Sequence, residues 1–162
     1  MIAVRQMELT DLEQVMPIEE ANFSIPWTAN GFFSFLLRED ALFLVAEDEE
    51  TAEILGYCGI LISFDEGDIT NVCVREEDRR KGIGRMLVER LIQETKKAGV
   101  TVWHLEVRQS NEGAIRLYES LGFAQDGLRK GYYEEPREDA VLMSRREQEI
   151  KASVHPGNDS AD

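Results

Sequence analysis

Three apolar runs joined by short polar connectors constrain the fold of this chain more than any other feature. The runs are residues 41–48, 54–63 and 68–74, and five and then four residues separate them. Connectors this short join antiparallel neighbours, whereas parallel neighbours need a crossover of about a dozen residues or more. The middle of the chain is therefore predicted to form an antiparallel three-stranded meander.

A helical crossover is predicted directly after this meander. Apolar residues recur with helical spacing across residues 82–98, and Gly99 is a typical residue to end such a helix. Residues 100–107 then read as a buried strand. Because a helix connects them, the strands at residues 68–74 and 100–107 are predicted to be parallel neighbours.

The flanking elements complete a predicted order of β-α-α-β-β-β-α-β-α-β-β, which is an α/β fold with a mixed sheet and helices on both faces. At the N-terminal side, the local signals predict a strand at residues 2–7 and a helix capped by Thr10 and Glu13, which Pro17 kinks or interrupts. Thr28 is predicted to cap the next helix. At the C-terminal side, they predict a helix capped by Asn111 and stopped by Gly122, and a final strand pair at residues 131–135 and 139–144. We predict one domain over residues 1–148 and a disordered tail over residues 149–162.

The charge of the chain limits its partners. Acidic residues outnumber basic ones by 32 to 18, which gives a net charge of -14. Phosphate neutralisation needs basic surface, so nucleic acid is excluded as the main partner. The charge suits a basic protein or an amine, but solubility alone also explains it and is the simpler explanation on charge alone.

Cysteine use and hydropathy indicate a reducing, aqueous compartment. Cys58 and Cys73 lie in apolar runs without metal-ligand spacing, so we predict two buried thiols and no metal site. The N-terminus lacks the apolar segment of a signal peptide. No apolar run approaches the ~20 residues of a membrane span. The sequence therefore predicts a cytoplasmic protein with no membrane partner.

Positive charge and glycine gather at the start of the predicted long helix, in the stretch RRKGIGR at residues 79–85. Glycines allow close backbone approach, and a helix start offers free N–H groups to an anion such as pyrophosphate. A solvated, flexible turn is the alternative. Four side chains are expected to add mobile positive charge here: Arg79, Arg80, Lys81 and Arg85.

Two phosphate-binding motifs do not fit this stretch. The P-loop requires a lysine followed by Ser or Thr after its second glycine, whereas Lys81 precedes both glycines. The dinucleotide fingerprint requires a third glycine where this chain has Leu87. Taken alone, the stretch leaves the anion site and the plain turn about equally supported.

The pattern Arg79-x-x-Gly82-x-Gly84 resembles the pyrophosphate loop of the GNAT acetyltransferases, and it follows a strand and opens a long helix as it does in that family. The stretch LEVRQSNEGAIRLYESLGF, residues 105–123, resembles the family's second signature. The resemblance covers roughly residues 1–145. It implies acetyl-CoA as donor, and it implies that the strands at 68–74 and 100–107 splay apart around the pantetheine arm.

The resemblance also implies which residues bind acetyl-CoA. Backbone groups of one strand would pair with the pantetheine arm, and the loop would hold the pyrophosphate. The predicted binding residues are Val72, Cys73, Val74, Arg79, Arg80, Lys81, Gly82, Ile83, Gly84, Arg85 and Asn111.

Within the family, the stretches EEANFSIPWT and RKGYYEEPREDAVLMS resemble the ribosomal-protein-alanine N-acetyltransferases, the RimI type. This implies acetylation of a protein N-terminus, an N-terminal alanine of a small-subunit ribosomal protein, and hence a basic partner. Two alternatives stay open: a GNAT enzyme for a small-molecule amine, and a non-catalytic acyl-CoA-binding module. The oligomeric state is open as well.

The resemblance implies two catalytic residues. Glu106 is the implied general base, and the alternative is a carboxylate paired with Arg108 on the same strand face. Tyr118 is the implied proton donor to the CoA thiolate, and the alternative is a core aromatic. Four further residues are left without an assigned role, because each is either a structural residue or part of a groove for the peptide substrate: His104, Trp27, Tyr132 and Tyr133.

Overall fold

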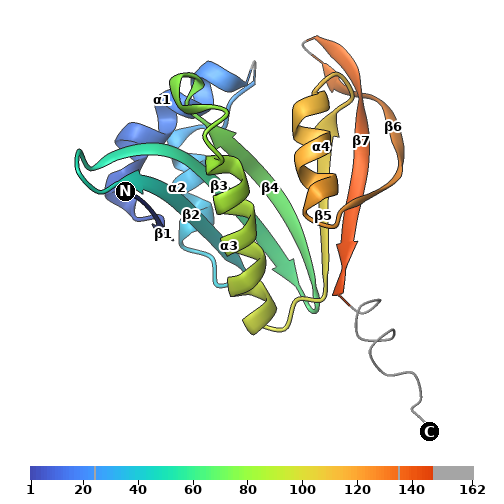
Figure 1. The fold of residues 1–162 in the computed structure, drawn as a ribbon, viewed down its shortest axis with the longest axis horizontal. Coiled ribbons are helices and arrows are strands. Elements are labelled where there is room, and N and C mark those ends of the chain that lie inside the picture. The colour runs from blue at the N-terminus through green and yellow to red at the C-terminus, as the bar shows by residue number, and fades with distance from the viewer. Residues whose placement is uncertain (24, 135, 148–162) are drawn as a thin grey trace, which may run out of the picture.

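The computed structural model describes residues 1–23, 25–134 and 136–147. Its helices and strands follow the predicted order (Figure 1). Their bounds are β1 Ile2–Gln6, α1 Leu12–Asn22, α2 Ala29–Leu36, β2 Ala41–Asp48, β3 Glu53–Ser63, β4 Glu66–Val74, α3 Ile83–Lys97, β5 Val102–Arg108, α4 Glu112–Ser120, β6 Ala124–Glu134 and β7 Arg137–Arg146. Short 3-10 turns at Leu9–Asp11 and Glu76–Asp78 precede α1 and α3.

One seven-stranded sheet runs through the molecule in the order β1-β2-β3-β4-β5-β7-β6. Strands β2, β3 and β4 form the predicted antiparallel meander, and β4 pairs with β5 in parallel. The mixed sheet is therefore confirmed. Every other pairing is antiparallel, including that of β1 with β2, which α1 and α2 separate along the chain.

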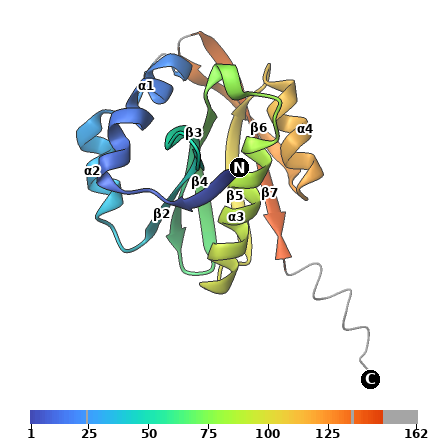
Figure 2. The same ribbon diagram turned by 60° about the vertical axis from the view of Figure 1, so that its left-hand side comes forward.

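Helices cover both faces of this sheet, as Figure 2 shows. Helices α1 and α2 pack on one face over a cluster that includes Val15, Phe32 and Tyr57. Helices α3 and α4 pack on the other face over a larger cluster that includes Leu87 and Trp103. The two clusters give the sheet an apolar layer on each side, which is the predicted arrangement.

Strands β4 and β5 separate soon after they meet. Their ladder holds only three pairs, Glu66↔Val102, Gly67↔Trp103 and Asp68↔His104. Figure 1 shows the strands close together at one end and well apart at the other. The expected splay between them is thus present, and it divides the sheet into a β1–β4 half and a β5–β7 half.

The predicted start of α1 is wrong, and Pro17 does not interrupt the helix. Pro17 lies inside α1, and the helix continues past it to Asn22. A proline removes one backbone hydrogen bond, and here buried residues on both sides of it keep the helix packed on the sheet. Thr10 lies in the 3-10 turn, where Asp11 instead accepts a hydrogen bond from the Glu8 amide at 2.8 Å.

The final strands are longer than residues 131–135 and 139–144, because β6 begins at Ala124 and β7 ends at Arg146. Nearly all of β6 is exposed, so its sequence lacks the alternation that reveals a half-buried strand. The predicted caps by Thr28 and Asn111 are confirmed. The tail at 149–162 lies outside the described residues. No helix in the described part of the chain is long and apolar enough to cross a membrane.

Candidate active site

The loop before α3 turns sharply by using left-handed backbone. Arg80 has a φ of 67° and Gly82 a φ of 81°. Gly82 is the residue before the first turn of α3, and its position carries no side-chain cap. The first N–H groups of α3 therefore have no capping side chain, which is the arrangement that favours an anion at a helix start.

A buried carboxylate holds this loop in place. Asp78 is 6% exposed and lies between Arg75, at 2.7 Å, and Lys81, at 3.0 Å. Burial disfavours its charged form, but hydrogen bonds from Lys81 and Arg75 outweigh this and hold the pKa of Asp78 below its ordinary value. The loop is thus ordered by its own charges.

Two of the arginines expected to be mobile are also bound to neighbouring elements. Arg79 bonds to the Asn22 side chain at the end of α1, and its Nε lies 3.4 Å from the Val74 carbonyl oxygen. Arg85 bonds to Ser120 at the end of α4. Both arginines therefore contact neighbouring elements at the place where α1, β4 and α4 meet.

Gly84 has no steric reason to be glycine. A Cβ built there meets Leu117 at 3.5 Å and Val74 at 3.9 Å, which are ordinary contacts. Glycine in a helix costs about 1 kcal/mol relative to alanine. The protein alone would therefore be more stable with a side chain at this position, so the glycine points to an external group that approaches the backbone.

The end of β4 presents an unpaired backbone edge towards β5. On its other edge, β4 pairs with β3 through Val72, Cys73 and Val74, and the Arg75 amide bonds to the Leu55 carbonyl at 2.8 Å. Backbone groups alternate sides along a strand, so those of Val72 and Val74 face the side on which β5 has moved away. This edge can accept a further extended chain.

Glu106 lies on β5, on the face opposite the core residues Leu105 and Val107, and its side chain is 35% exposed. Arg129 approaches it to 3.6 Å from β6, and a hydrogen bond to Glu106 raises the pKa of the Tyr132 phenol. The alternative partner Arg108 pairs with Glu138 at 3.3 Å. The ion pairs found for Glu106 and for Arg108 thus join each of them to a different strand.

Tyr118 has a ring in the core and a hydroxyl that is buried with it. Its side chain is buried, and its ring packs edge-on against Phe123 with centroids 5.8 Å apart. Burial raises the pKa of the phenol above its ordinary value, and Cys58, Tyr133 and Cys73 raise it further. These neighbours belong to β3, β6 and β4. The ring packs in the core, and the catalytic role of the hydroxyl stays a prediction.

The remaining candidates divide between packing and surface. Trp27 stacks on Phe35 with centroids 4.8 Å apart and packs against the core below α2. Tyr132 is 41% exposed beside Glu106. Burial and then Glu106 raise the pKa of Tyr133 to about 12.

His104 and Asn111 both have structural partners. His104 Nε2 lies 2.7 Å from Glu66 and Nδ1 lies 3.2 Å from Ser144, so the ring bridges β4 and β7 at the closed end of the splay. Asn111 accepts a hydrogen bond from the Ala114 amide at 3.2 Å as the cap of α4. Its predicted contact with acetyl-CoA is compatible with this role.

Both thiols are buried, so we expect neither to react with a disulfide reagent in the native protein at pH 8. Burial raises the pKa of Cys73 to about 12 and raises that of Cys58 as well. At pH 8 the reactive thiolate is therefore a negligible fraction of either residue. Titration with Ellman's reagent should detect both thiols only after denaturation. Rapid reaction of either thiol in the folded protein would contradict this expectation.

Sequence reasoning missed one polar cluster. Glu19 is 1% exposed on the packed face of α1, where it bonds to Tyr57 and to the Trp27 amide. Its spacing from Val15, four residues earlier, placed an acidic residue on an apolar helix face. That mismatch was the available signal.

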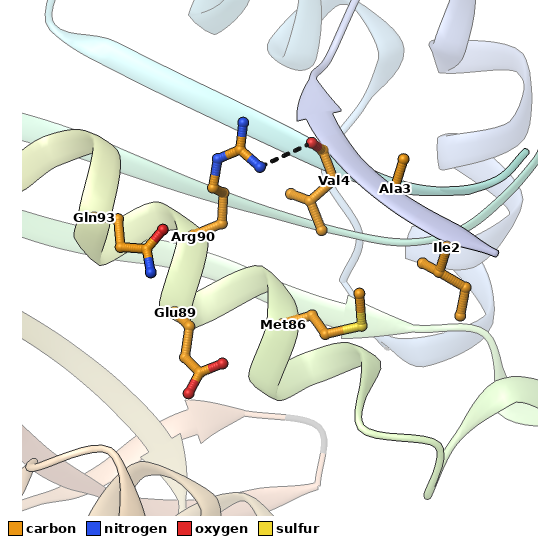
Figure 3. Close-up of a pocket in the computed structure, with 7 residues that line it drawn as sticks. All are labelled: Ile2, Ala3, Val4, Met86, Glu89, Arg90 and Gln93. Atoms are coloured by element: carbon orange, nitrogen blue, oxygen red, sulfur yellow. Dashed lines mark hydrogen bonds between the residues drawn. The ribbon is translucent and has the colours of Figure 1, made fainter.

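A hollow of about 380 Å³ lies between β1 and α3, away from the predicted active-site residues (Figure 3). Its lining includes Ile2, Val4 and Met86, and Arg90 donates a hydrogen bond to the Val4 carbonyl at 3.3 Å. None of the predicted site residues lines it.

Residues 8–123 match the model of the acetyltransferase (GNAT) family. The chain belongs to this family. Among GNAT relatives, the [ribosomal protein bS18]-alanine N-acetyltransferase of Escherichia coli K12 is 35% identical over 146 residues, which are 89% of this chain and 97% of that protein. The enzyme of the same name from Salmonella typhimurium is 38% identical over 141 residues, which are 85% and 93% of the two chains.

Solved GNAT structures share the fold. The crystal structure of the ribosomal-protein-S18-alanine N-acetyltransferase from Escherichia coli superposes with a TM-score of 0.82 at 35% identity, covering 90% of this chain and 94% of that one. The Arabidopsis thaliana NAA60 structure in complex with acetyl-CoA has the same TM-score at 20% identity, covering 90% and 99%, and shows the fold alone. No group of three or more metal-ligating side chains occurs among the described residues.

Proposed function

We propose that this protein transfers the acetyl group of acetyl-CoA to the α-amino group of an N-terminal alanine of ribosomal protein bS18. This is the reaction after which its relatives are named. The similarity to two bacterial enzymes with this name over nearly their whole length carries the proposal. The net charge of -14 supports it, because an acidic enzyme attracts a basic ribosomal protein. The reaction would take place in the cytoplasm, where ribosomal proteins are made.

The site fits acetyl-CoA at two separate places. The uncapped start of α3 and Gly84 suit the pyrophosphate, which the amides of residues 80–85 would hold. The free edge at Val72 and Val74 suits the amide groups of the pantetheine arm. Acetyl-CoA supplies an activated thioester, and the remaining chemistry is the movement of protons by the protein.

Glu106 is the proposed general base. An α-amino group has a pKa of about 8 and is mostly protonated at neutral pH, so it must lose a proton before it can attack. Glu106 projects from β5 on the open face of the sheet, where it can receive that proton directly or through a water. Its ion pair with Arg129 is long and partly exposed, and is therefore weak enough to leave the carboxylate available.

Tyr118 is the proposed proton donor to the leaving thiolate. Its buried phenol stays protonated because burial raises the pKa above the ordinary value. A proton donated to the departing sulfur lets CoA leave as the neutral thiol, which is a better leaving group than the thiolate. Cys58 of β3, Tyr133 of β6 and Cys73 of β4 are close enough to raise the pKa of the Tyr118 phenol further.

We expect Tyr118→Phe to lower turnover while leaving the free energy of unfolding within ~1 kcal/mol, the scale of one net hydrogen bond. The substitution removes only the hydroxyl and keeps the ring on Phe123. Turnover is measured at saturating acetyl-CoA, well below the melting temperature of the variant. Unchanged turnover there would assign the proton to water and leave Tyr118 as a core residue.

Intact-mass spectrometry tests the function itself. Purified bS18 with a free N-terminal alanine, incubated with enzyme and acetyl-CoA, should gain one acetyl group at its N-terminus. A bS18 variant whose N-terminus is already acetylated is the matched control and should gain none. Acetylation of a polyamine or free amino acid in preference to bS18 would overturn the substrate, and binding of acetyl-CoA without turnover on any amine would overturn the enzyme.

A further inference from the structure

Four polar side chains form a row of contacts across the sheet at the closed end of the splay. Nε2 of His104 on β5 lies 2.7 Å from Glu66 on β4, and Nδ1 of the same ring lies 3.2 Å from the Ser144 hydroxyl on β7. The Ser144 hydroxyl in turn donates a hydrogen bond to Asp126 on β6. The strands β4, β5, β7 and β6 are consecutive neighbours, so this row joins the two halves of the sheet.

The directions of these hydrogen bonds determine where the protons lie. A carboxylate only accepts, and a hydroxyl has a single proton to donate. Because Ser144 donates its proton to Asp126, its oxygen must accept from a protonated Nδ1 of His104. Glu66 also only accepts, so Nε2 must carry a proton as well. All the bonds are therefore made together only when His104 is an imidazolium cation.

Loss of one proton from the ring would break one particular bond. Nδ1 would keep its proton, because Ser144 remains its acceptor and is only 5% exposed. Nε2 would then turn a lone pair towards Glu66, whose side chain is 57% exposed and can move into water. A neutral His104 therefore stays bound to β7 and separates from β4.

The bond between His104 and Glu66 lies where the two halves of the sheet meet. Strands β4 and β5 pair at three positions, and His104 belongs to the last of them, opposite Asp68 (Figure 1). Beyond this pair, β4 continues to Val72–Val74, the edge proposed for the pantetheine arm, and β5 continues to Glu106. A side-chain tie at this position therefore controls how far that edge stands from the proposed base.

Other charged groups lie on the same face of the sheet as His104. Side chains two residues apart on a strand share a face. Asp68 on β4, Glu106 on β5 and Arg146 on β7 therefore lie on this face, one alternation from the row of contacts. A pH effect measured on the whole protein would include these groups, so the test has to change the partner of Nε2 alone.

We propose that His104 is a positioning residue: as a cation it ties β4 to β5 and β7 at the closed end of the splay, and so holds the pantetheine-binding edge at the distance from Glu106 that acetyl transfer requires. This inference rests on the proposed function. The tie is present when the ring is protonated and is lost as pH rises through the range in which histidines lose their charge. It acts on the pantetheine arm and not on the pyrophosphate, because Asp78 orders the loop before α3 independently.

Glu66→Leu removes the acceptor on β4 and leaves the residues assigned to acetyl-CoA unchanged. The Thr101 amide donates to the Asp65 carbonyl at 2.8 Å across the same junction. Hydrogen exchange at this amide should accelerate ~3-fold, and the dissociation constant for acetyl-CoA should rise by a similar factor, as expected for the loss of one partly exposed ion pair. Binding of ADP, which carries a pyrophosphate but no pantetheine arm, should not change.

Glu66→Gln is the matched variant for the role of the proton. Its amide offers an oxygen to a protonated Nε2 and an N–H to a neutral one, so it can bind His104 in both states. At pH 6 it should bind acetyl-CoA as the unmodified protein does. Between pH 6 and pH 8 the dissociation constant of the unmodified protein should rise ~3-fold relative to that of Glu66→Gln, because only the unmodified protein loses the tie.

The possible results separate positioning from general stability. Unchanged exchange at Thr101 or unchanged acetyl-CoA binding in Glu66→Leu would overturn the inference. Equal weakening of acetyl-CoA and ADP binding would also overturn it, as would a pH dependence that Glu66→Gln shares with the unmodified protein. If the unmodified protein does not bind acetyl-CoA, the proposed function is wrong, and exchange at Thr101 by itself decides whether His104 ties the two halves together.

Discussion

We expect Glu106→Gln to lower turnover by ~10²-fold or more at neutral pH, which is the usual loss when a general base is removed. Acetyl-CoA affinity should stay nearly unchanged, because Glu106 lies on β5 and the loop assigned to the cofactor lies before α3. Glutamine has the same shape, so the fold should persist. Turnover at saturating acetyl-CoA and the melting temperature together check both statements.

The pH dependence of this variant identifies the missing step. The amine substrate has a pKa of about 8, so its neutral fraction grows as pH rises from 7 to 9. The rate of Glu106→Gln should therefore recover partly with pH, whereas the unmodified enzyme gains less. Glu66→Gln, the same substitution on the neighbouring strand β4, is the control and should retain activity. Full activity of Glu106→Gln at pH 7 would remove Glu106 from the mechanism.

The fold was predictable where local pattern and tertiary packing agree. The bounds of β2 matched residue by residue, because an apolar run between polar turns has one favourable arrangement. Helix α3 also matched to within one residue at each end, since its spacing and its terminal glycine agree. The predicted interruption at Pro17 does not occur, because the local rule ignores the packing that holds α1 on the sheet. The start of β6 was missed because an exposed strand shows no apolar alternation.

The chemistry of the site came from resemblance, and its geometry came only from the fold. Nothing in the local sequence pairs Glu106 with Arg129 on β6, because that contact depends on β7 lying between β5 and β6. Arg108 was the nearer candidate along the strand, but Glu138 on β7 occupies it. The Glu19 cluster likewise joins α1 to β3 and β4. Local sequence patterns leave such long-range polar partners open.

The second large effect concerns the loop before α3. We expect Gly84→Asp to weaken acetyl-CoA binding by ~100-fold or more, because juxtaposing like charges at a binding site costs several kcal/mol and about 1.4 kcal/mol corresponds to tenfold. The fold itself should not suffer. A Cβ fits at this position, and a carboxylate in the first turn of a helix is favourable for the helix dipole.

Gly84→Asp should weaken acetyl-CoA binding but not the stability of the fold, and this difference makes the test decisive. Thermal unfolding without ligand should show Gly84→Asp at least as stable as the unmodified protein, and only the increase in melting temperature on adding acetyl-CoA should disappear. Gly113→Asp makes the same change in the first turn of α4, where a Cβ also meets open space, and should keep that increase. If Gly84→Asp still binds acetyl-CoA normally, the glycine serves the turn alone and the pyrophosphate lies elsewhere. If both variants lose the increase, the added negative charge acts at long range, and the loop is not the specific site that its backbone geometry indicates.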